Sequence, residues 1–187
     1  MQIVLVSFFL LAVPLSACRT ERLPVAVGKD KNARLIDSLP QSTTVQTLVG
    51  LPRPRKYPNN SRLGATELTT WEIRAAILNF KLDVNGDYHV VVGDKSGHTM
   101  IVEIQAPACL KGSPFLKVVK EVRRHFEERF PKQPSRKRQA PPKPIQVIIH
   151  GVGFFDRIRG QPGAAPNGVE LSPVTLICFE NEACEGI

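Results

Sequence analysis

Residues 66–104, TELTTWEIRAAILNFKLDVNGDYHVVVGDKSGHTMIVEI, decide the fold. Apolar residues alternate from Trp71 to Ile77 and then, after a switch of phase, from Leu78 to Leu82. Because successive side chains of a strand point to opposite faces, such a switch within one strand predicts a bulge or a sharp bend. The first strand of the domain is therefore expected to be long and bent.

Two more strands follow after tight turns. Asp83–Asp87 reads DVNGD, and Asn-Gly is a strong hairpin signal because both residues tolerate positive φ. A calcium loop is the alternative, but counted from Asp83 its required sixth-position glycine would be Tyr88. The hairpin is favoured. Tyr88–Val92 and His98–Ile104 are then the second and third strands of an antiparallel meander.

A helix and two further strands complete the pattern. Ser113-Pro114 opens a helix with apolar residues at helical spacing up to Phe130, and Pro131 ends it. Residues 145–155 and 172–179 are the fourth and fifth strands. The order β-β-β-α-β-β, with a bent first strand, predicts a mainly β (α+β) fold, an OB-like five-stranded barrel.

The chain of 187 residues is long enough for one domain with additional segments. Residues 66–180 are assigned to the OB-like domain, with a basic, proline-rich insertion at 131–144 that is expected to be extended and mobile. Residues 18–65 are expected to be a mostly irregular leader, in which Val45–Leu51 could form a short strand or a helix turn. Residues 181–187 form a short acidic tail.

Residues 1–17, MQIVLVSFFLLAVPLSA, predict a secretory signal peptide, because the apolar run is too short for a stable membrane span. They lack the usual basic residue at the start, and a hydrophobic N-terminal strand or helix is the alternative. Leu15-Ser16-Ala17-Cys18 also fits a lipoprotein signal, in which Cys18 is lipidated. The expected location is thus the cell envelope as a lipoprotein, or the periplasm or medium without an anchor. Membrane contact is expected only through such an anchor.

Export would place the cysteines in an oxidising compartment. With Cys18 lipidated, one disulfide and one free thiol are expected. Strands three and five of an OB barrel run parallel, and Cys109 and Cys184 follow their ends by equal distances, so these two are predicted to pair. Cys178 would be a buried thiol, and Cys109–Cys178 is the competing pair.

The loop-rich stretch 151–173, GVGFFDRIRGQPGAAPNGVELSP, is the candidate binding site. It is too polar and glycine-rich for a core, and structured loops often carry binding groups. Its polar side chains are predicted to contact the ligand: Asp156, Arg159, Gln161, Asn167 and Glu170. The alternative is a loop that satisfies its own backbone, with Asp156 and Asn167 in side-chain turns.

The preferred function is a non-catalytic exported binding module with an unknown ligand at 156–170. The alternative is a hydrolase, a nuclease or a glycan-cleaving enzyme, that uses Asp156 and Glu170 with His150 or His98. His89, His98 and His150 lie on or at the ends of predicted strands and Glu103 lies within the third strand, so a His–Glu pair could supply a base and its orienter, but exposed sheet or turn residues are favoured. The sequence has no spacing typical of a metal site and no nucleophile motif, so neither a metal nor a cofactor is expected.

The positive charge is concentrated in one segment. Residues 111–143 hold eleven basic residues against three acidic ones, which accounts for the whole net charge of +8. This predicts an anionic partner, either a polymer or lipid headgroups. Nucleic acid is weakly supported, because aromatic residues that could stack on bases are scarce.

From about Thr66 to Phe179 the chain resembles a family of uncharacterised exported bacterial proteins. The resemblance rests on residues 80–104 and on GVGFFD, GQ and APNGVEL-x-PV between 151 and 174. It implies a small exported β-rich domain and no particular activity. The family tends to have His where this chain has Arg159 and Ser172, which weighs against imidazole catalysis here.

Overall fold

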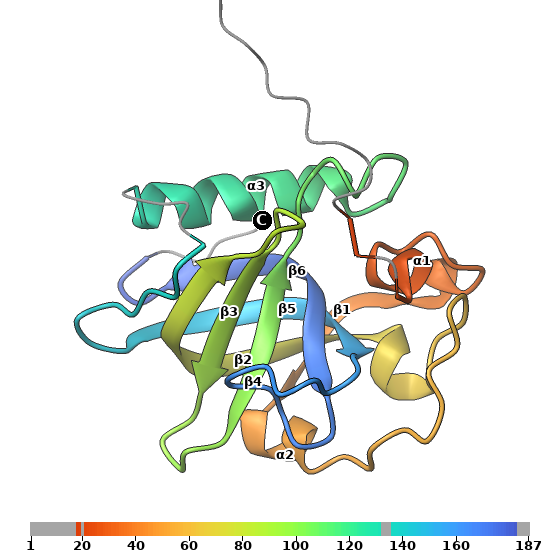
Figure 1. Ribbon diagram of the computed structural model, residues 1–187, viewed down its shortest axis with the longest axis horizontal. Coiled ribbons are helices and arrows are strands. Elements are labelled where there is room, and N and C mark those ends of the chain that lie inside the picture. The colour runs from red at the N-terminus through yellow and green to blue at the C-terminus, as the bar shows by residue number, and fades with distance from the viewer. Residues whose placement is uncertain (1–17, 20, 132–135, 183–187) are drawn as a thin grey trace, which may run out of the picture.

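A computed structural model of the chain describes residues 18, 19, 21–131 and 136–182. Five strands close into a mixed barrel, because the last strand in the sheet order β2-β3-β4-β6-β5 pairs back onto β2. Figure 1 shows the barrel with one long helix across its upper end. The strands of the barrel are β2 (Thr69–Leu82), β3 (Tyr88–Gly93), β4 (Thr99–Ile104), β5 (Ile145–Phe155) and β6 (Val169–Phe179).

The first barrel strand is bent as predicted. The register of β2 against β3 shifts between Ile77 and Asn79, which is a bulge at the predicted change of phase. The first half of β2 pairs with β5 and the second half pairs with β3. A single long strand can serve two neighbours in this way because the bulge increases its local twist.

The topology confirms an OB-like barrel. β4 and β6 run parallel, with Ile101 opposite Glu170 and Val102 opposite Leu171, whereas the other neighbouring barrel strands are antiparallel. The single helix between β4 and β5 agrees with the predicted order. Residues of alternate positions, among them Ile73, Val90 and Val102, fill the barrel interior.

Helix α3 (Leu116–Arg129) closes one end of the barrel (Figure 1). Its apolar stripe places Phe126 in the core, 5.2 Å from the ring of Phe80 in an edge-to-face contact. Phe130, at the end of the helix, lies 4.5 Å from the same ring. The aromatic cluster anchors α3, because such pairs add to the stability that burial alone provides.

The leader is more ordered than predicted. It forms a parallel strand against β2 and several short helices, and Val45 and Leu48 are part of the main core. Val45–Val49 is a helix turn, one of the two predicted possibilities. The elements of the leader are α1 (Leu23–Ala26), η2 (Ala33–Leu35), β1 (Asp37–Thr43), α2 (Val45–Val49) and η3 (Ala65–Leu68).

A buried ion pair fixes the leader to the barrel. Both terminal nitrogens of Arg22 contact the carboxylate of Glu67, at 2.6 and 2.8 Å, and Glu67 has no exposed surface. Glu67 also accepts hydrogen bonds from the backbone amides of Leu63 and Phe155. The guanidinium nitrogens of Arg22 and both carboxylate oxygens of Glu67 have partners, so the leader is attached through polar contacts that an apolar pattern does not predict.

The basic insertion is only partly as expected. Residues 132–135 lie outside the described residues, but Gln139 exchanges two backbone hydrogen bonds with Phe80, both of 2.8 Å. The Arg138 side chain contacts the Asn79 amide oxygen. The described part of the insertion therefore lies along β2 as an extra bridge and is not a free connection.

The cysteine pairing differs from the prediction. Cys109 is bonded to Cys18, with their Cα atoms 5.7 Å apart, so the predicted Cys109–Cys184 pair was wrong. The packed leader brings Cys18 to the barrel, which the assignment of a loose leader did not anticipate. A thioether-linked lipid would need the same Cys18 sulfur that this disulfide uses; lipidation at Cys18 stays a prediction. No described cysteine is free, which also corrects the prediction of a free thiol at Cys178.

Cys184 and the predicted signal peptide, residues 1–17, lie outside the described residues. Within the described part of the chain, no helix has the length and apolar character needed to cross a membrane.

Candidate functional site

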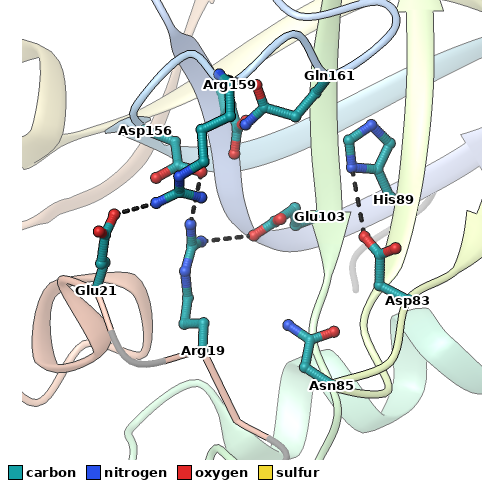
Figure 2. A pocket seen from close by; sticks show the side chains of 10 residues that line it. Arg19, Glu21, Asp83, Asn85, His89, Glu103, Asp156, Arg159 and Gln161 are labelled. Atoms are coloured by element: carbon teal, nitrogen blue, oxygen red, sulfur yellow. Dashed lines mark hydrogen bonds and ion pairs between the residues drawn. The ribbon is translucent and has the colours of Figure 1, made fainter.

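A polar cleft of about 450 Å³ lies on the outer face of the barrel. It is bounded by the β2–β3 turn, by the loop between β5 and β6, and by the segment that precedes α1 (Figure 2). In an OB barrel, the corresponding strand faces and loops bind extended ligands. The side chains that line the cleft are Arg19, Glu21, Asp83, Asn85, His89, Glu103, Asp156, Arg159, Gln161 and Glu170.

Four of the five predicted ligand residues line this cleft: Asp156, Arg159, Gln161 and Glu170. Glu170 is a strand residue, because β6 begins at Val169, three residues before the predicted start. Asn167 instead fits the alternative interpretation, in which side chains of the loop satisfy backbone groups. Its amide donates to the backbone oxygens of Leu48 and Leu51, and its oxygen accepts from Val169, so it braces the loop from outside the cleft.

Glycines shape the loop between β5 and β6. The backbone amide of Asp156 donates to the oxygen of Gly168 at 2.8 Å, which closes the base of the loop. Gly163 has a φ of +83°, and a Cβ there would lie 2.4 Å from a methyl group of Val91. The loop can thus lie flat over β3 only because residue 163 has no side chain.

Arg19 occupies the cleft from the N-terminal side. One guanidinium nitrogen lies 2.8 Å from a carboxylate oxygen of Glu103, and the other lies 2.9 Å from Asp156 (Figure 2). The guanidinium carbon is also 4.9 Å from the ring centroid of Phe154. Burial lowers the pKa of Arg19, but the carboxylates of Glu103 and Asp156 outweigh it and raise that pKa above its ordinary value.

A chain of hydrogen bonds orients Glu103 from behind. The Ser172 hydroxyl donates to Glu103 at 3.2 Å, and the Gln105 amide donates to that hydroxyl at 3.0 Å and to the Ala26 oxygen at 2.7 Å. Ser172 thus supports the site from behind the cleft, whereas Arg159 lines the cleft itself.

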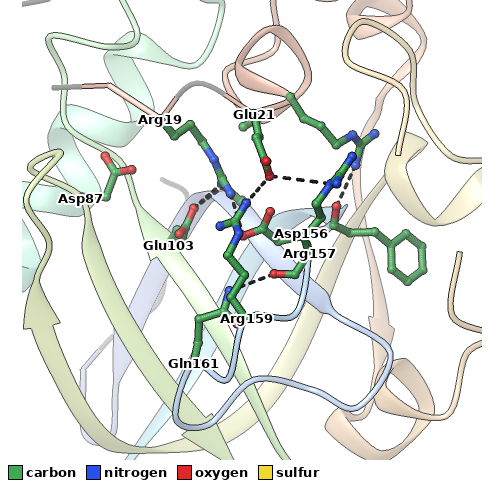
Figure 3. A network of polar contacts seen from close by, with 12 residues as sticks. Arg19, Glu21, Asp87, Glu103, Asp156, Arg157, Arg159 and Gln161 are labelled. Atoms are coloured by element: carbon green, nitrogen blue, oxygen red, sulfur yellow. Dashed lines mark hydrogen bonds and ion pairs between the residues drawn. The ribbon is translucent and has the colours of Figure 1, made fainter. Parts of the chain in front are cut away.

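A second ion-pair network lies at the outer edge of the cleft (Figure 3). Glu21 contacts the guanidinium of Arg159 and lies 3.7 Å from that of Arg157. The side-chain oxygen of Gln161 accepts from the backbone amide of Arg159. This network joins the N-terminal segment to the loop between β5 and β6.

Two buried polar atoms in the cleft-lining residues have no hydrogen-bond partner: Oε2 of Glu170 and Nε2 of His89. Burial, followed by the charges of Glu103 and Asp156, raises the pKa of Glu170 well above its ordinary value. Burial lowers the pKa of His89, with the carboxylates of Glu103 and Asp83 opposing it. Burial thus favours the protonated form of Glu170, in which a carboxyl group can donate as well as accept a hydrogen bond.

The predicted hairpin turn forms at Asp83–Asp87. Asp83 accepts from the amide of Gly86, and the Asn85 amide reaches the carboxylate of Asp87 at 2.7 Å. Burial and the charge of Glu103 raise the pKa of Asp87 to about 7. A buried, partly protonated carboxyl group therefore lies directly beside the cleft.

The other histidines lie elsewhere. His150 contacts Glu72 at 3.0 Å and His98 contacts Asp94 at 2.9 Å, so neither joins Asp156 and Glu170 as the hydrolase alternative required. The histidine that lines the cleft together with Asp156 and Glu170 is His89, which lies opposite Glu103 in the register of β3 and β4. Within the described ranges, no group of three or more His, Cys, Asp or Glu residues is arranged to hold a metal ion.

Sequence reasoning missed Arg19 entirely. A single arginine after a signal sequence carries no motif, and only the packing of the leader brings it to β4 and β5. The favoured interpretation of His89 and Glu103 as exposed residues was wrong: both are buried, and the register of β3 against β4 places them opposite each other.

Basic side chains gather away from the acidic cleft. On α3, Arg123 and Arg124 are paired with glutamates of the same helix. A separate cleft of about 590 Å³ lies entirely outside the segment 111–143 and is lined by Arg53, Arg55, Lys56, Tyr57, Arg157 and Ile158. An anionic partner for 111–143 stays a prediction.

Neither a protein-family model nor a curated protein matches this chain.

Proposed function

We propose that the protein is an exported OB-like binding module whose ligand occupies the acidic cleft. The observation that carries this proposal is the convergence of Asp156, Arg159, Gln161 and Glu170 with groups from β3, β4 and the β2–β3 turn in one cleft. The cleft lies on the part of the barrel that other OB folds use for binding, and this analogy supports the proposal at the level of the fold alone.

The lining determines the kind of ligand. Five acidic side chains line the cleft against two arginines, so acidic groups remain in excess although Arg19 is paired with Glu103 and Asp156, and Arg159 with Glu21. Such a surface repels polyanions and attracts groups that donate hydrogen bonds or carry positive charge. We therefore expect a cationic or donor-rich ligand here, and any anionic partner would bind elsewhere.

Export is part of the proposal. It is supported by the apolar signal at residues 1–17 and by the disulfide between Cys18 and Cys109, which is typical of oxidising compartments. Because that disulfide uses the Cys18 sulfur, we propose release to the periplasm or medium without a lipid anchor.

Ligand screening by NMR tests the proposal. The ¹⁵N-labelled protein is titrated with neutral sugars, amino sugars, polyamines, amino-acid amides and oligonucleotides. A ligand should shift the amide signals of His89, Glu103 and Gln161, and Asp156→Asn should weaken its binding about tenfold or more, because it removes a charge-assisted contact.

Glu72→Gln is the matched control, because Glu72 pairs with His150 outside the cleft. It should leave the affinity unchanged. Ligands that shift only signals of α3, or that bind Asp156→Asn as tightly as the wild type, would contradict the assignment of the cleft.

The hydrolase alternative keeps one specific observation in its favour. Glu170, whose pKa is raised by burial, lies in the same cleft as Asp156, and a pair of carboxyl groups can supply a general acid and a general base. His89 would replace the predicted His150 or His98. The assay is hydrolysis of chromogenic glycosides and of single-stranded DNA, with and without Mg²⁺ or Ca²⁺.

Activity that Glu170→Gln abolishes and His150→Ala leaves intact would favour the hydrolase. Ligand binding without turnover would favour the binding module.

A further inference from the structure

Side chains of the cleft surround Arg19 in the way that a binding site surrounds its ligand. One carboxylate from β4 and one from the loop after β5 contact its two terminal nitrogens, and the ring of Phe154 lies 4.9 Å from its guanidinium carbon. Planar, two-sided pairing with carboxylates plus an aromatic ring is the arrangement that suits a guanidinium and not an ammonium. Only 13% of the Arg19 side chain remains exposed.

The groups that hold Arg19 belong to the barrel. Glu103 is on β4, Phe154 is on β5, and Asp156 immediately follows β5. Glu103 is oriented by Ser172, independently of Arg19. The guanidinium site is therefore built by the barrel, and a site oriented in advance binds with a smaller entropic cost.

Arg19 leaves part of the cleft unsatisfied. Oε2 of Glu170 and Nε2 of His89 are buried without partners, although both residues line the same cleft. An unmade hydrogen bond at a buried polar atom costs free energy. An external polypeptide that inserts an arginine would bring further backbone donors and acceptors of its own as partners for these two atoms.

The segment that carries Arg19 is fastened at both ends. Cys18, the residue before it, is bonded to Cys109, and Arg22 is paired with the buried Glu67. If the signal peptide is removed after Ala17, the disulfide is the only covalent tie on the N-terminal side. A short tether gives its bound group a local concentration of about millimolar, so Arg19 competes strongly with ligands in solution.

We propose that Arg19 is an internal ligand of a guanidinium site, and that the external ligand of this site is an arginine side chain of another polypeptide. The inference rests on the proposed function of the cleft as a binding face. The N-terminal segment then limits access, because an external arginine must displace Arg19 first.

Calorimetric titration with N-acetyl-arginine amide tests the inference. Arg19→Ala, which vacates the site, should bind this probe about tenfold or more tightly than the wild type, because the binding-competent fraction rises. Arg34→Ala, an exposed arginine of the same leader, should behave like the wild type. N-acetyl-citrulline amide, a neutral relative of the probe, should not bind. The double variant Arg19→Ala/Asp156→Asn should lose the increase in affinity that Arg19→Ala alone produces.

A second variant covers the case in which Arg19→Ala does not fold. Replacing Cys18 and Cys109 together by serine keeps Arg19 but removes one anchor, and should also tighten binding of the arginine probe. Absence of a gain in whichever of the two variants folds would overturn the inference.

The outcomes separate this inference from the proposed function. If no variant gains affinity for the arginine probe but another compound from the screen shifts the signals of the cleft, the inference fails and the binding face stands. If neither the probe nor any screened compound reaches the cleft, both fail.

Discussion

Asp87→Asn should change how the stability of the protein depends on pH. Asp87 is 4% exposed, and burial together with the charge of Glu103 raises its pKa from 3.8 to about 7. Between these values the folded protein keeps a proton that the unfolded chain has released. The free energy of unfolding therefore falls as pH rises through this window.

The magnitude follows from the shift. At about 1.4 kcal/mol for each pH unit, the contribution of Asp87 falls by up to about 4 kcal/mol between pH 3.8 and pH 7. Asparagine does not titrate, so the variant lacks this loss. The stability of Asp87→Asn minus that of the wild type should rise by a similar amount from pH 4 to pH 8.

Urea denaturation at pH 4, 5.5 and 8 measures this difference. Asp94→Asn is the control of opposite sign. Slight burial raises the pKa of Asp94, but hydrogen bonds from His98 and Ser96 outweigh it and lower that pKa. Asp94 thus stabilises the fold above its unfolded pKa, and this contribution disappears at low pH. A difference for Asp87→Asn that stays constant within about 1 kcal/mol would refute the reasoning.

Three further predictions test the architecture. Arg22→Met should cost about 3–5 kcal/mol in urea denaturation, because Glu67 is left buried without its partner, whereas Arg34→Met should cost under about 0.5 kcal/mol; equal effects would contradict the anchoring role. Gly163→Ala should destabilise the fold more than Gly160→Ala, because both have positive φ but only Gly163 abuts Val91; thermal melts compare them. Non-reduced peptide mapping should yield a Cys18–Cys109 peptide; a Cys109–Cys184 peptide or a lipid-modified Cys18 would contradict the structure.

The barrel could be predicted because its strands carry local patterns. Each of these patterns depends only on residues that are neighbours in the sequence. They are the Asn85-Gly86 turn, the phase switch after Ile77 and the apolar stripe of α3, and together they specify the order of elements. The parallel pairing of β4 and β6 then follows from the OB order.

The leader could not be predicted in the same way. Arg22 and Glu67 form a buried pair although they are 45 residues apart in the chain. Nothing in the sequence around either residue distinguishes it from a charged residue on the surface. The expectation of a loose leader led in turn to the wrong partner for Cys109. The errors in the leader and in the cysteine pairing thus share one physical cause, which is polar burial over long sequence distances.

The candidate site was partly predictable. Asp156, Arg159 and Gln161 stand out because a polar, glycine-rich loop follows an apolar strand. Asn167 shares that composition but stabilises backbone groups, and composition alone cannot separate the two roles. Arg19 enters the site only because of the three-dimensional fold.

The most direct test of the binding cleft is the ¹³C signal of its carboxyl groups. In Arg19→Ala titrated with N-acetyl-arginine amide, the carboxyl signals of Glu103 and Asp156 should move together and saturate, while that of Glu72 stays fixed. Binding that leaves Glu103 and Asp156 unmoved, or that shifts Glu72 equally, would contradict the assignment of this cleft as the ligand site.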